Sequence, residues 1–562
     1  MIFWAQNLLI LVLGTATVVA QTPTSVIVDE VRKHTANLPF VMPEVKVPEF
    51  PNYRVDIRDF GAVADGRTLN TEAFEKAIQN CSEKGGGVVV VPAGTWLTGP
   101  IKLESNIDLQ VERGAVIQFS KRIEDFPLIA GLDGKSKRYI ITPPLYAYRA
   151  KNVGISGEGI IDGGGEAWRY VKKDKLTESQ WKDLIVSGGV ISPNGREWWP
   201  SKEAWEGEEY LKEIAKSGRQ PAKEDIQHVR EFVRPDLLQL VQCDGILLDG
   251  TTFENSPKFH VRPAQSQNVI IRNIKIRAPW YGQNTDALDP TSCRNVIIYG
   301  VTIDVGDDGI CLKPGTIASN QTEGPSCQNF VITDCVVYQA HGGFVIGSES
   351  YGGVNNVYVH NCTFIGTDVG LRFKSLRGRG GLVQNVFIDG IQMRSIATEA
   401  ILFDMYYGGG SPDMESVKSD NTQQEQAVTE RTPRFQKFSI KNVVCNGAKT
   451  AFLIKGLAEM PVKDLTLENV SIEADRGAIL SQADGVVMRN CYIAAKEGPV
   501  VSLDDARNIT INRLAYPKGA SVFLKVSGDK SQSIHIEGVD LTLAKKDLEF
   551  ATGLKTDIVT VK

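Results

Sequence analysis

Two adjacent aspartates, Asp307 and Asp308, stand just before an apolar run in the segment DVGDDGICLKPG, which spans Asp304 to Gly315. Carboxylates that share a site repel each other, and this raises the pKa of at least one of them. A pair of one protonated and one ionised carboxyl group is what general acid and base catalysis needs near neutral pH. The first question is therefore which other reactive side chains the fold brings to this pair.

A repeat in the second half of the chain answers that question. Each copy alternates apolar and polar residues, which predicts a strand rather than a helix. Successive copies start at steps of mostly about 21 to 34 residues, and each is too short to bury its own apolar face. The copies begin at Asn268, Asn295, Asn329, Asn356, Asn385, Lys437, Asp464, Gly485 and Asn508.

Stacking such copies buries a continuous core, as in solenoid proteins. The sequence therefore predicts an all-β protein, a right-handed parallel β-helix with a helical and loop insertion. A β-sandwich would instead need hairpin turns between antiparallel strands. Two-residue Asn-Gly and Asp-Gly hairpins do not punctuate the repeat.

The repeat also aligns a second strand on successive turns. Gly309, Gly343 and Gly370 each follow the Asn that opens their copy by 14 residues, so the three strands that they begin are predicted to be equivalent. Side chains alternate along a strand. The alternation sends Ile310, Leu312, Phe344, Ile346, Leu371 and Phe373 into the core. It sends Cys311, Lys313, Arg372 and Lys374 outward, with Lys313 one turn from Lys374.

The same alignment gathers charged groups on one outer face. His341 matches Asp307, because each follows its opening Asn by 12 residues, and Asp286 lies one turn earlier. Neighbouring turns are about 4.8 Å apart. A single Asp before a strand is ordinarily a turn residue, whereas three carboxylates, an imidazole, an arginine and a lysine in one column favour a functional site.

At these residues the sequence resembles glycoside hydrolase family 28, the polygalacturonases and their relatives. The family's marks stand here as NTD (284–286), GDD (306–308), HGG (341–343) and RFK (372–374). The segment GQNTDALDPTSC is similar to the bacterial exo-acting branch of that family. Two positions depart from the pattern: Phe373 replaces an Ile, and Ala340 replaces the Gly before the His.

The resemblance implies an inverting hydrolase that needs no metal or other cofactor and cleaves α-linked galacturonate in pectin from a chain end. Asp307 would be the general acid, and Asp286 and Asp308 would hold and activate the attacking water. His341 would tune the acid and contact the substrate. One acid and one base across the bond is the two-carboxylate scheme of glycosidases, although sequence does not give the separation that distinguishes inversion from retention.

Basic and aromatic residues complete the predicted binding site. Arg372 and Lys374 would bind a sugar carboxylate, a role that suits a basic patch beside acidic catalysts. We interpret Arg377 and Arg379, which follow them, as a solvated charged loop. The other predicted substrate-binding residues are Asn284, Lys313, Tyr406, Tyr407 and Arg262, the last standing where the exo-acting branch often has His.

Three alternatives remain open. A rhamnogalacturonan-type hydrolase would share the family. A pectate lyase would share the fold, but it would need Ca²⁺ and would release unsaturated products. A non-catalytic glycan-binding β-helix would leave oligogalacturonides intact, and binding alone does not need the aspartate column.

The chain divides into an expected signal peptide (1–20), an N-terminal extension (21–52) and a single β-helix domain (53–562). Insertions are expected at about 164–235 and 408–434. The first holds five tryptophans, which we interpret as its own small core rather than as a sugar platform. The signal peptide predicts a secreted or periplasmic protein, and no later segment is apolar enough to span a membrane.

Composition agrees with this interpretation. The 562 residues carry a net charge of −5, which argues against a nucleic-acid partner because such proteins have a basic surplus. The expected partner is a pectic polysaccharide or oligogalacturonide. The nine cysteines give an odd count with no zinc-type spacing, so most are expected to be small buried hydrophobic residues.

Overall fold

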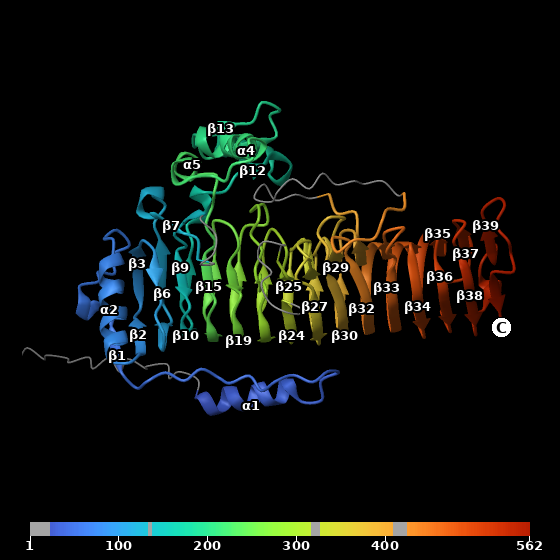
Figure 1. Ribbon diagram of the computed structural model, residues 1–562, viewed down its shortest axis with the longest axis horizontal. Helices are drawn as coiled ribbons and strands as arrows, with labels where there is room; N and C mark the ends of the chain where they lie inside the picture. Colours follow the sequence, from blue (N-terminus) through green and yellow to red (C-terminus); the bar gives the residue numbers. More distant parts are fainter. Residues whose placement is uncertain (1–22, 133–137, 316–325, 409–423) are drawn as a thin grey trace, which may run out of the picture.

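The computed structural model describes residues 23–132, 138–315, 326–408 and 424–562. The chain winds into a long stack of parallel strands, with the N-terminal end of the stack at the left of Figure 1 and the C-terminal end at the right. The predicted all-β parallel β-helix is confirmed. Within the described residues, none of the helices combines the length and the apolar character that crossing a bilayer requires.

Three ladders of parallel strands form the walls of the helix. The first runs through β1 (Arg54–Asp56), β2 (Gly87–Val91), β5 (Ile107–Val111), β10 (Lys151–Ser156), β16 (Asp244–Asp249), β19 (Gln267–Arg272), β21 (Arg294–Tyr299), β24 (Cys327–Thr333), β27 (Val354–His360), β30 (Leu382–Arg394), β32 (Arg434–Lys455), β33 (Val462–Ser481), β34 (Ala483–Arg489), β36 (Arg507–Asn512), β38 (Gln532–Glu537) and β40 (Val559–Val561).

The second ladder runs through β3 (Gly94–Thr98), β6 (Ala115–Phe119), β11 (Ile160–Asp162), β17 (Thr252–Glu254), β20 (Lys275–Arg277), β22 (Thr302–Asp304), β25 (Val336–Tyr338) and β28 (Thr363–Ile365). The third runs through β4 (Ile101–Lys102), β9 (Leu145–Tyr148), β15 (Leu238–Val241), β18 (Val261–Ala264), β23 (Ile310–Leu312), β26 (Gly342–Ile346), β29 (Val369–Lys374) and β31 (Glu399–Asp404). Toward the C-terminus β35 (Tyr492–Asp504), β37 (Val522–Ser527) and β39 (Leu548–Phe550) continue the walls.

An asparagine ladder explains why so many copies of the repeat open with Asn. Asn268, Asn295, Asn329 and Asn356 all have φ between 56 and 60°, a left-handed conformation that Asn tolerates better than most residues. The side-chain amide of Asn329 donates to Asn295 Oδ1 at 3.0 Å, and that of Asn356 donates to Asn329 Oδ1 at 3.1 Å. The corner therefore needs Asn both for its backbone and for its side chain.

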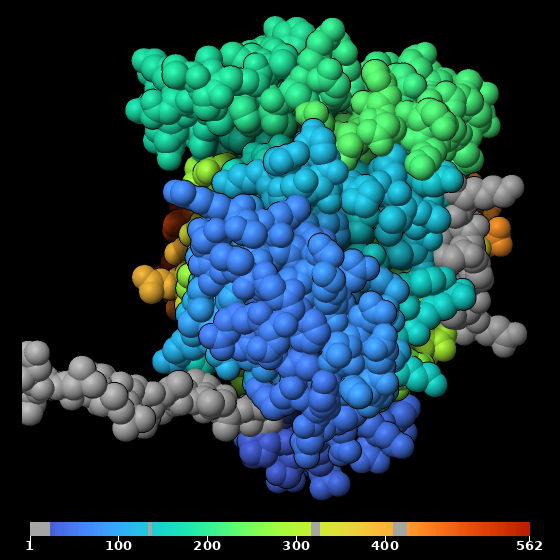
Figure 2. Space-filling model, turned by 90° about the vertical axis from the view of Figure 1, so that its left-hand side faces the viewer, coloured from blue at the N-terminus to red at the C-terminus, as the bar shows by residue number. Residues whose placement is uncertain are grey.

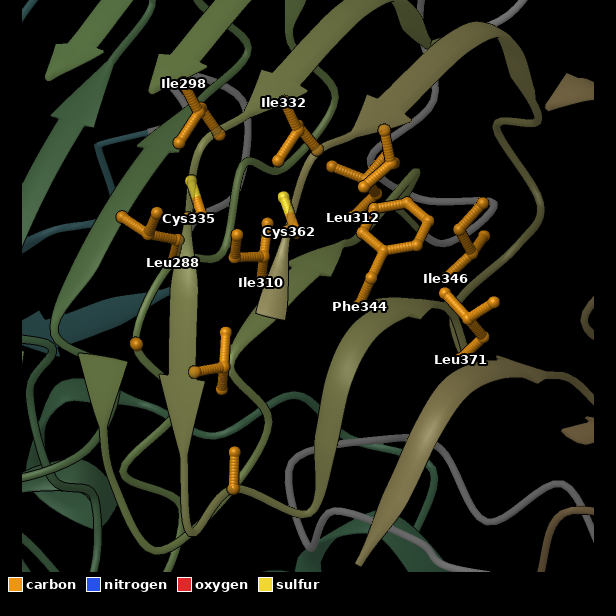
Figure 3. Close-up of a cluster of buried hydrophobic side chains, with 14 of the residues drawn as sticks. Leu288, Ile298, Ile310, Leu312, Ile332, Cys335, Phe344, Ile346, Cys362 and Leu371 are labelled. Atoms are coloured by element: carbon orange, nitrogen blue, oxygen red, sulfur yellow. The ribbon is translucent and has the colours of Figure 1, made fainter. Parts of the chain in front are cut away.

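The inward side chains form one continuous core. The side chains that alternation assigns to the inside, Ile310, Leu312, Phe344, Ile346, Leu371 and Phe373, are all at most 1% exposed. Figure 3 shows several of them packed against Leu288, Ile298 and Ile332 from neighbouring turns. The predicted inward face is confirmed, and all nine cysteines are free and buried, as expected.

Two helices lie at the N-terminal end. α2 (Thr71–Glu83) covers the open end of the stack and contributes Phe74, Ala77 and Ile78 to the main core. α1 (Thr24–Thr35) lies along the first ladder instead, below β19 and β24 in Figure 1. Its Ile27 and Val31 pack against apolar side chains of β16, β19 and β21.

An insertion interrupts the strand ladders between Asp162, where β11 ends, and Leu238, where β15 begins. Between them lie β12 (Val171–Lys172), α3 (Glu178–Val186), β13 (Val190–Ile191), β14 (Glu197–Trp199), α4 (Lys202–Lys216) and α5 (Lys223–His228), which form a lid-shaped layer over the top of the stack (Figures 1 and 2). Trp181 and Trp198 form a small core of this layer with Val171, as expected, whereas Trp168 joins the main core. A hairpin of β7 (Leu128–Ala130) and β8 (Tyr139–Ile141) lies outside the ladders.

Residues 1–20 and 409–423 lie outside the described residues, so the structure is silent on the expected signal peptide and on most of the second expected insertion.

Candidate active site

The third ladder positions the acidic cluster. Asp307 and Asp308 precede β23, and His341 precedes β26 on the next turn, where its backbone N–H donates to Asp307 O at 3.0 Å. On the other side the N–H of Ala287 donates to Asp308 O at 2.9 Å, which places Asp286 beside Asp308. One carboxylate oxygen from each of Asp286, Asp307 and Asp308 lies within 4.8 Å of the other two.

The three carboxylates differ in their exposure to solvent. The side chain of Asp307 is 18% exposed, whereas those of Asp286 and Asp308 are 4% and 2% exposed. Asp307 is thus the member of the cluster that a large substrate reaches most easily.

Asp308 is held in its ionised form by two cations. Arg372 Nη1 lies 3.1 Å from its Oδ1, and Lys374 Nζ lies 2.6 Å from its Oδ2. Burial raises the pKa of Asp308, but the charges of Lys374 and Arg372 outweigh burial and bring the pKa well below its usual range. The ionised form of Asp308 is therefore favoured.

Asp286 has the opposite protonation preference. Its Oδ2 accepts from Lys313 Nζ at 2.9 Å, and its buried Oδ1 has no hydrogen-bond partner within the described residues. Burial raises the pKa of Asp286 to about 7, Lys313 lowers it, and the charges of Asp307 and Asp308 add to the increase. The raised pKa that like-charge clustering predicts is therefore found on Asp286.

Asp307 is paired with His341. His341 Nδ1 lies 3.3 Å from Asp307 Oδ1, and His341 Nε2 lies 3.5 Å from Asp368 Oδ2. Burial raises the pKa of Asp307, but His341 outweighs burial and the pKa is lowered. For His341, burial lowers the pKa and the hydrogen bond with Asp307 reverses this, so the pKa is raised. In the free protein the proton of this pair resides on the imidazole.

Asp289 is a site residue that the sequence analysis missed. Lys313 Nζ lies 3.4 Å from Asp289 Oδ2 as well as 2.9 Å from Asp286, so one ammonium serves two buried carboxyl groups. Neither oxygen of Asp289 has a hydrogen-bond partner within the described part of the chain, and burial raises its pKa well above the usual value. The bridge between Leu288 and Ile310 places Asp289 beside Cys311, an outward position that the same repeat alignment could have found.

Two expectations about the basic residues are wrong. Lys313 and Lys374 are two turns apart rather than one, because Leu312 pairs with Ile346 and Ile346 pairs with Phe373. Arg377 is not part of a solvated loop: its side chain is 9% exposed and it makes hydrogen bonds of 2.7 and 2.8 Å to Glu459.

The other predicted binding residues lie in different surroundings. Tyr407 faces the site, with Lys374 Nζ 4.9 Å and the Arg372 guanidinium 5.6 Å from its ring centroid. Tyr406 faces Arg377 instead, at 5.5 Å. Arg262 donates to Asp236 at 3.0 Å and to Thr291 Oγ1 at 3.2 Å.

The insertion also contributes to the site, which sequence reasoning did not anticipate. Arg234, near its end, donates to Asn284 Oδ1 at 2.7 Å and to Gln283 O at 3.1 Å. Its guanidinium lies 5.7 Å from the ring centroid of Tyr170, which stacks on Trp199 of the insertion at 4.3 Å. The amide of Asn284 thus helps to dock the insertion on the turn that carries Asp286.

The donor set of the cluster does not suit a divalent cation. Asp286, Asp307 and Asp308 are close enough to share one ion. However, Lys313, Arg372 and Lys374 already lie 2.6 to 3.1 Å from Asp286 and Asp308. A metal ion would have to displace these charges or bear their repulsion.

Glycosidic bond cleavage needs one protonated and one ionised carboxyl group near the scissile bond. This parallel β-helix carries carboxyl groups of both kinds, clustered on one outer face. The family model described as Glycosyl hydrolases family 28 matches residues 172–473, more than half of the chain and all of the acidic cluster. The chain belongs to this family. A second model, Rhamnogalacturonase A/epimerase, pectate lyase-like, matches residues 54–182.

Similar proteins agree with this assignment. A solved hyperthermoactive exopolygalacturonase from Thermotoga maritima is 30% identical, covers 84% of this chain and 96% of its own, and superposes with a TM-score of 0.65. A probable polygalacturonase from Vitis vinifera is 28% identical over 74% of this chain and 73% of its own length. An exo-poly-alpha-D-galacturonosidase from Dickeya chrysanthemi is 27% identical over 72% of this chain and 64% of its own length. The protein is a glycoside hydrolase.

Proposed function

We propose that this protein hydrolyses α-glycosidic bonds of galacturonic acid residues in pectin and that it acts from a chain end. The observation that carries the proposal is the cluster of Asp286, Asp307 and Asp308 beside three cations. The names of the Thermotoga and Dickeya relatives support exo-action on polygalacturonate. The rhamnogalacturonase-like match ends before the first member of the cluster, so we do not extend the proposal to that substrate.

In the proposed mechanism Asp307 is the general acid. It is the most exposed carboxyl group of the cluster, and His341 beside it carries a proton. A substrate that covers the site excludes water and so penalises the charged His341–Asp307 pair, which favours transfer of the proton to Asp307. Asp307 then protonates the glycosidic oxygen of the leaving group.

Asp308 and Asp286 hold and activate the attacking water. Asp308 stays ionised between Arg372 and Lys374 and is the acceptor for a proton of that water. Asp286 Oδ1, which has no hydrogen-bond partner among the described residues, helps to orient the water. A water on this side of the sugar ring attacks the anomeric carbon as its bond to the leaving oxygen breaks. Asp308 takes one proton from the water and releases it to solvent, and Asp307 regains a proton from solvent through His341 before the next cycle.

We propose that the reaction inverts the anomeric configuration. One oxygen of each of the three carboxyl groups lies within 4.8 Å of the other two, whereas typical inverting enzymes separate their two carboxyl groups by about 6.5–9.5 Å. By separation alone the site would be assigned to a retaining enzyme. However, retention needs a carboxylate that attacks the sugar, and both oxygens of Asp308 are engaged by cations while Asp286 is buried. Proton NMR of the first-formed product would show the β-anomer for inversion.

Substrate carboxylates are proposed to bind at Arg372. Within the described residues it engages Asp308 through Nη1 alone, which leaves Nη2 for a ligand. Lys313 and Lys374 are occupied by buried carboxyl groups, so we assign them to the electrostatics of the cluster rather than to direct substrate contact.

We further propose that residues 1–20 form a signal peptide, that the protein is secreted or periplasmic, and that residues 53–562 form one catalytic domain. N-terminal sequencing of the protein from the culture fluid or periplasm would give Gln21 as the first residue. A first residue of Met1 would contradict the cleavage.

The experiment that tests the acid assignment compares two leaving groups. Asp307→Asn keeps the side-chain volume and removes the proton, so kcat/KM on oligogalacturonate falls by about 10²–10⁴-fold. An aryl α-galacturonide with a nitrophenol leaving group needs little protonation and loses far less. Asp308→Asn is the matched control, because loss of a base affects both substrates equally. If Asp286→Asn alone shows the substrate-dependent pattern, Asp286 is the acid instead.

A further inference from the structure

Trp280 lies on a loop that touches the catalytic turn. The main-chain oxygens of Pro279, Trp280 and Gly282 surround Gly306, so closely that a Cβ added there would meet them at 2.6 to 2.9 Å. Gly306 is the residue immediately before Asp307. Thr285 Oγ1 ties the same parts together, since it donates to Gly282 O at 2.9 Å and accepts from the N–H of Gly306 at 3.1 Å.

The insertion fixes this loop from the other side. Tyr281 packs against the small core that Val171, Trp181 and Trp198 form. Trp280, its neighbour, remains 47% exposed and is the only exposed tryptophan in the described part of the chain. A large apolar ring is thus exposed at the surface, on a loop whose main chain contacts the residue before the proposed general acid.

A cation accompanies this ring. Lys175, in the short 3₁₀ helix η4 (Lys173–Lys175) of the insertion, places Nζ 5.4 Å from the ring centroid of Trp280. No carboxylate among the described residues forms an ion pair with Lys175. The ammonium lies over the ring and has no carboxylate partner within the described residues, so a ligand that reaches the exposed surface of Trp280 also meets this charge.

An aromatic face beside an ammonium suits a carboxylated sugar. The ring can cover the apolar C–H face of a pyranose, and the ammonium can pair with the carboxylate at C6. We propose that Trp280 and Lys175 form a binding subsite for a galacturonate unit of the substrate other than the unit whose bond breaks. The inference rests on the proposed function, because it supplies that reaction with a recognition site built jointly by the insertion and the β-helix.

The test compares substrates that do and do not reach the subsite. Trp280→Ala should lower kcat/KM on trigalacturonate and longer oligomers by at least about tenfold. It should leave the rate on 4-nitrophenyl α-galacturonide, which has a single sugar, within about twofold of the wild type. Trp280→Phe should recover most of the loss. Equal loss on both substrates, or no loss on either, would overturn the subsite.

The charge is tested separately. Lys175→Met should raise KM for trigalacturonate and have little effect when the carboxylates are methyl-esterified. Lys173→Met, on the same short helix, should match the wild type on both substrates. An equal increase in KM on both substrates for Lys175→Met would refute its pairing with a carboxylate.

A binding measurement separates this inference from the proposed hydrolysis. Isothermal titration of trigalacturonate into Asp307→Asn, with and without Trp280→Ala, reads the subsite without turnover. If the wild type does not cleave galacturonides but the Trp280→Ala change still abolishes binding, the proposed activity fails and the subsite stands. If both variants bind trigalacturonate equally, the subsite is wrong even if the wild type is active.

Discussion

At the scale of single residues, partners rather than residue type decide what each aspartate does. Asp308 between Arg372 and Lys374 stays ionised, whereas Asp286, which shares Lys313 with Asp289, keeps a proton to about pH 7. In the proposed mechanism three chemically identical side chains thus serve as a base, a buried proton holder and an exposed acid.

The raised pKa of Asp286 predicts how kcat/KM falls on the alkaline side of the pH profile. Because the pKa of Asp286 is raised to about 7, the cluster holds one proton more below this pH than above it. When that proton leaves, three adjacent carboxylates are charged, and their repulsion weakens binding of the carboxylated substrate. We expect kcat/KM to fall as the pH rises through about 7, and a profile that stays flat well above pH 8 would contradict this.

Lys313→Met provides the diagnostic change. Lys313 lowers the pKa of Asp286, so its removal should move the alkaline limb upward by about one pH unit or more. A limb that stays in place would mean that a group other than Asp286 titrates there.

At the scale of the elements, a cluster of tilted and edge-to-face aromatic rings supports β29, the strand that carries Arg372 and Lys374. Phe373, which replaces the family's Ile between Arg372 and Lys374, has its ring centroid 4.5 Å from Phe403 and 5.0 Å from Phe438. Phe344 lies on the other side at 6.3 Å. The departure from the family pattern is therefore accommodated by neighbouring aromatic side chains on adjacent turns.

Phe373→Ala should remove this support. Truncation of a fully buried Phe costs about 3–5 kcal/mol of unfolding free energy, measurable by denaturant titration. The exposed Tyr338→Ala on β25 should change the stability by less than about 0.5 kcal/mol. A loss below about 1 kcal/mol for Phe373→Ala would mean that the aromatic rings around Phe373 contribute little to the stability of the protein.

The repeat made the strands, the inward face and the proximity of Asp307 to His341 predictable, because these follow from spacing within turns. It did not make the non-periodic contacts predictable. Glu459 reaches Arg377 across 82 residues, and Arg234 reaches Asn284 from an insertion. The predicted one-turn step from Lys313 to Lys374 is wrong because an intervening turn, which carries Gly347, lies between them.

At the scale of the whole molecule, different segments pack on two opposite faces of the β-helix. The insertion lies over the top of the stack, and α1 lies along the opposite side (Figure 1). Val31 and Ile27 of α1 cover apolar side chains of the first ladder, and Glu30 contacts Arg272 and Tyr299 at 3.0 Å. We infer that α1 serves stability and the insertion serves the site.

Val31→Asp should therefore show that α1 contributes to stability without contributing to activity. A charge at this buried position should release α1, lower the stability by more than about 1 kcal/mol and expose residues 24–50 to protease. Activity should remain close to that of the wild type. Val26→Asp, at a position of the same helix that is 43% exposed, is the matched control and should change neither property. Loss of activity that parallels the release of α1 would contradict the assignment.

The central claim is metal-independent hydrolysis of galacturonosyl bonds from a chain end, and product analysis tests it most directly. Polygalacturonate is incubated with the protein in EDTA, and reducing ends, chain-length distribution and absorbance of unsaturated uronides are followed. We expect free galacturonate, no unsaturated product and no effect of EDTA. Unsaturated products, or activity that EDTA abolishes and Ca²⁺ restores, would contradict it.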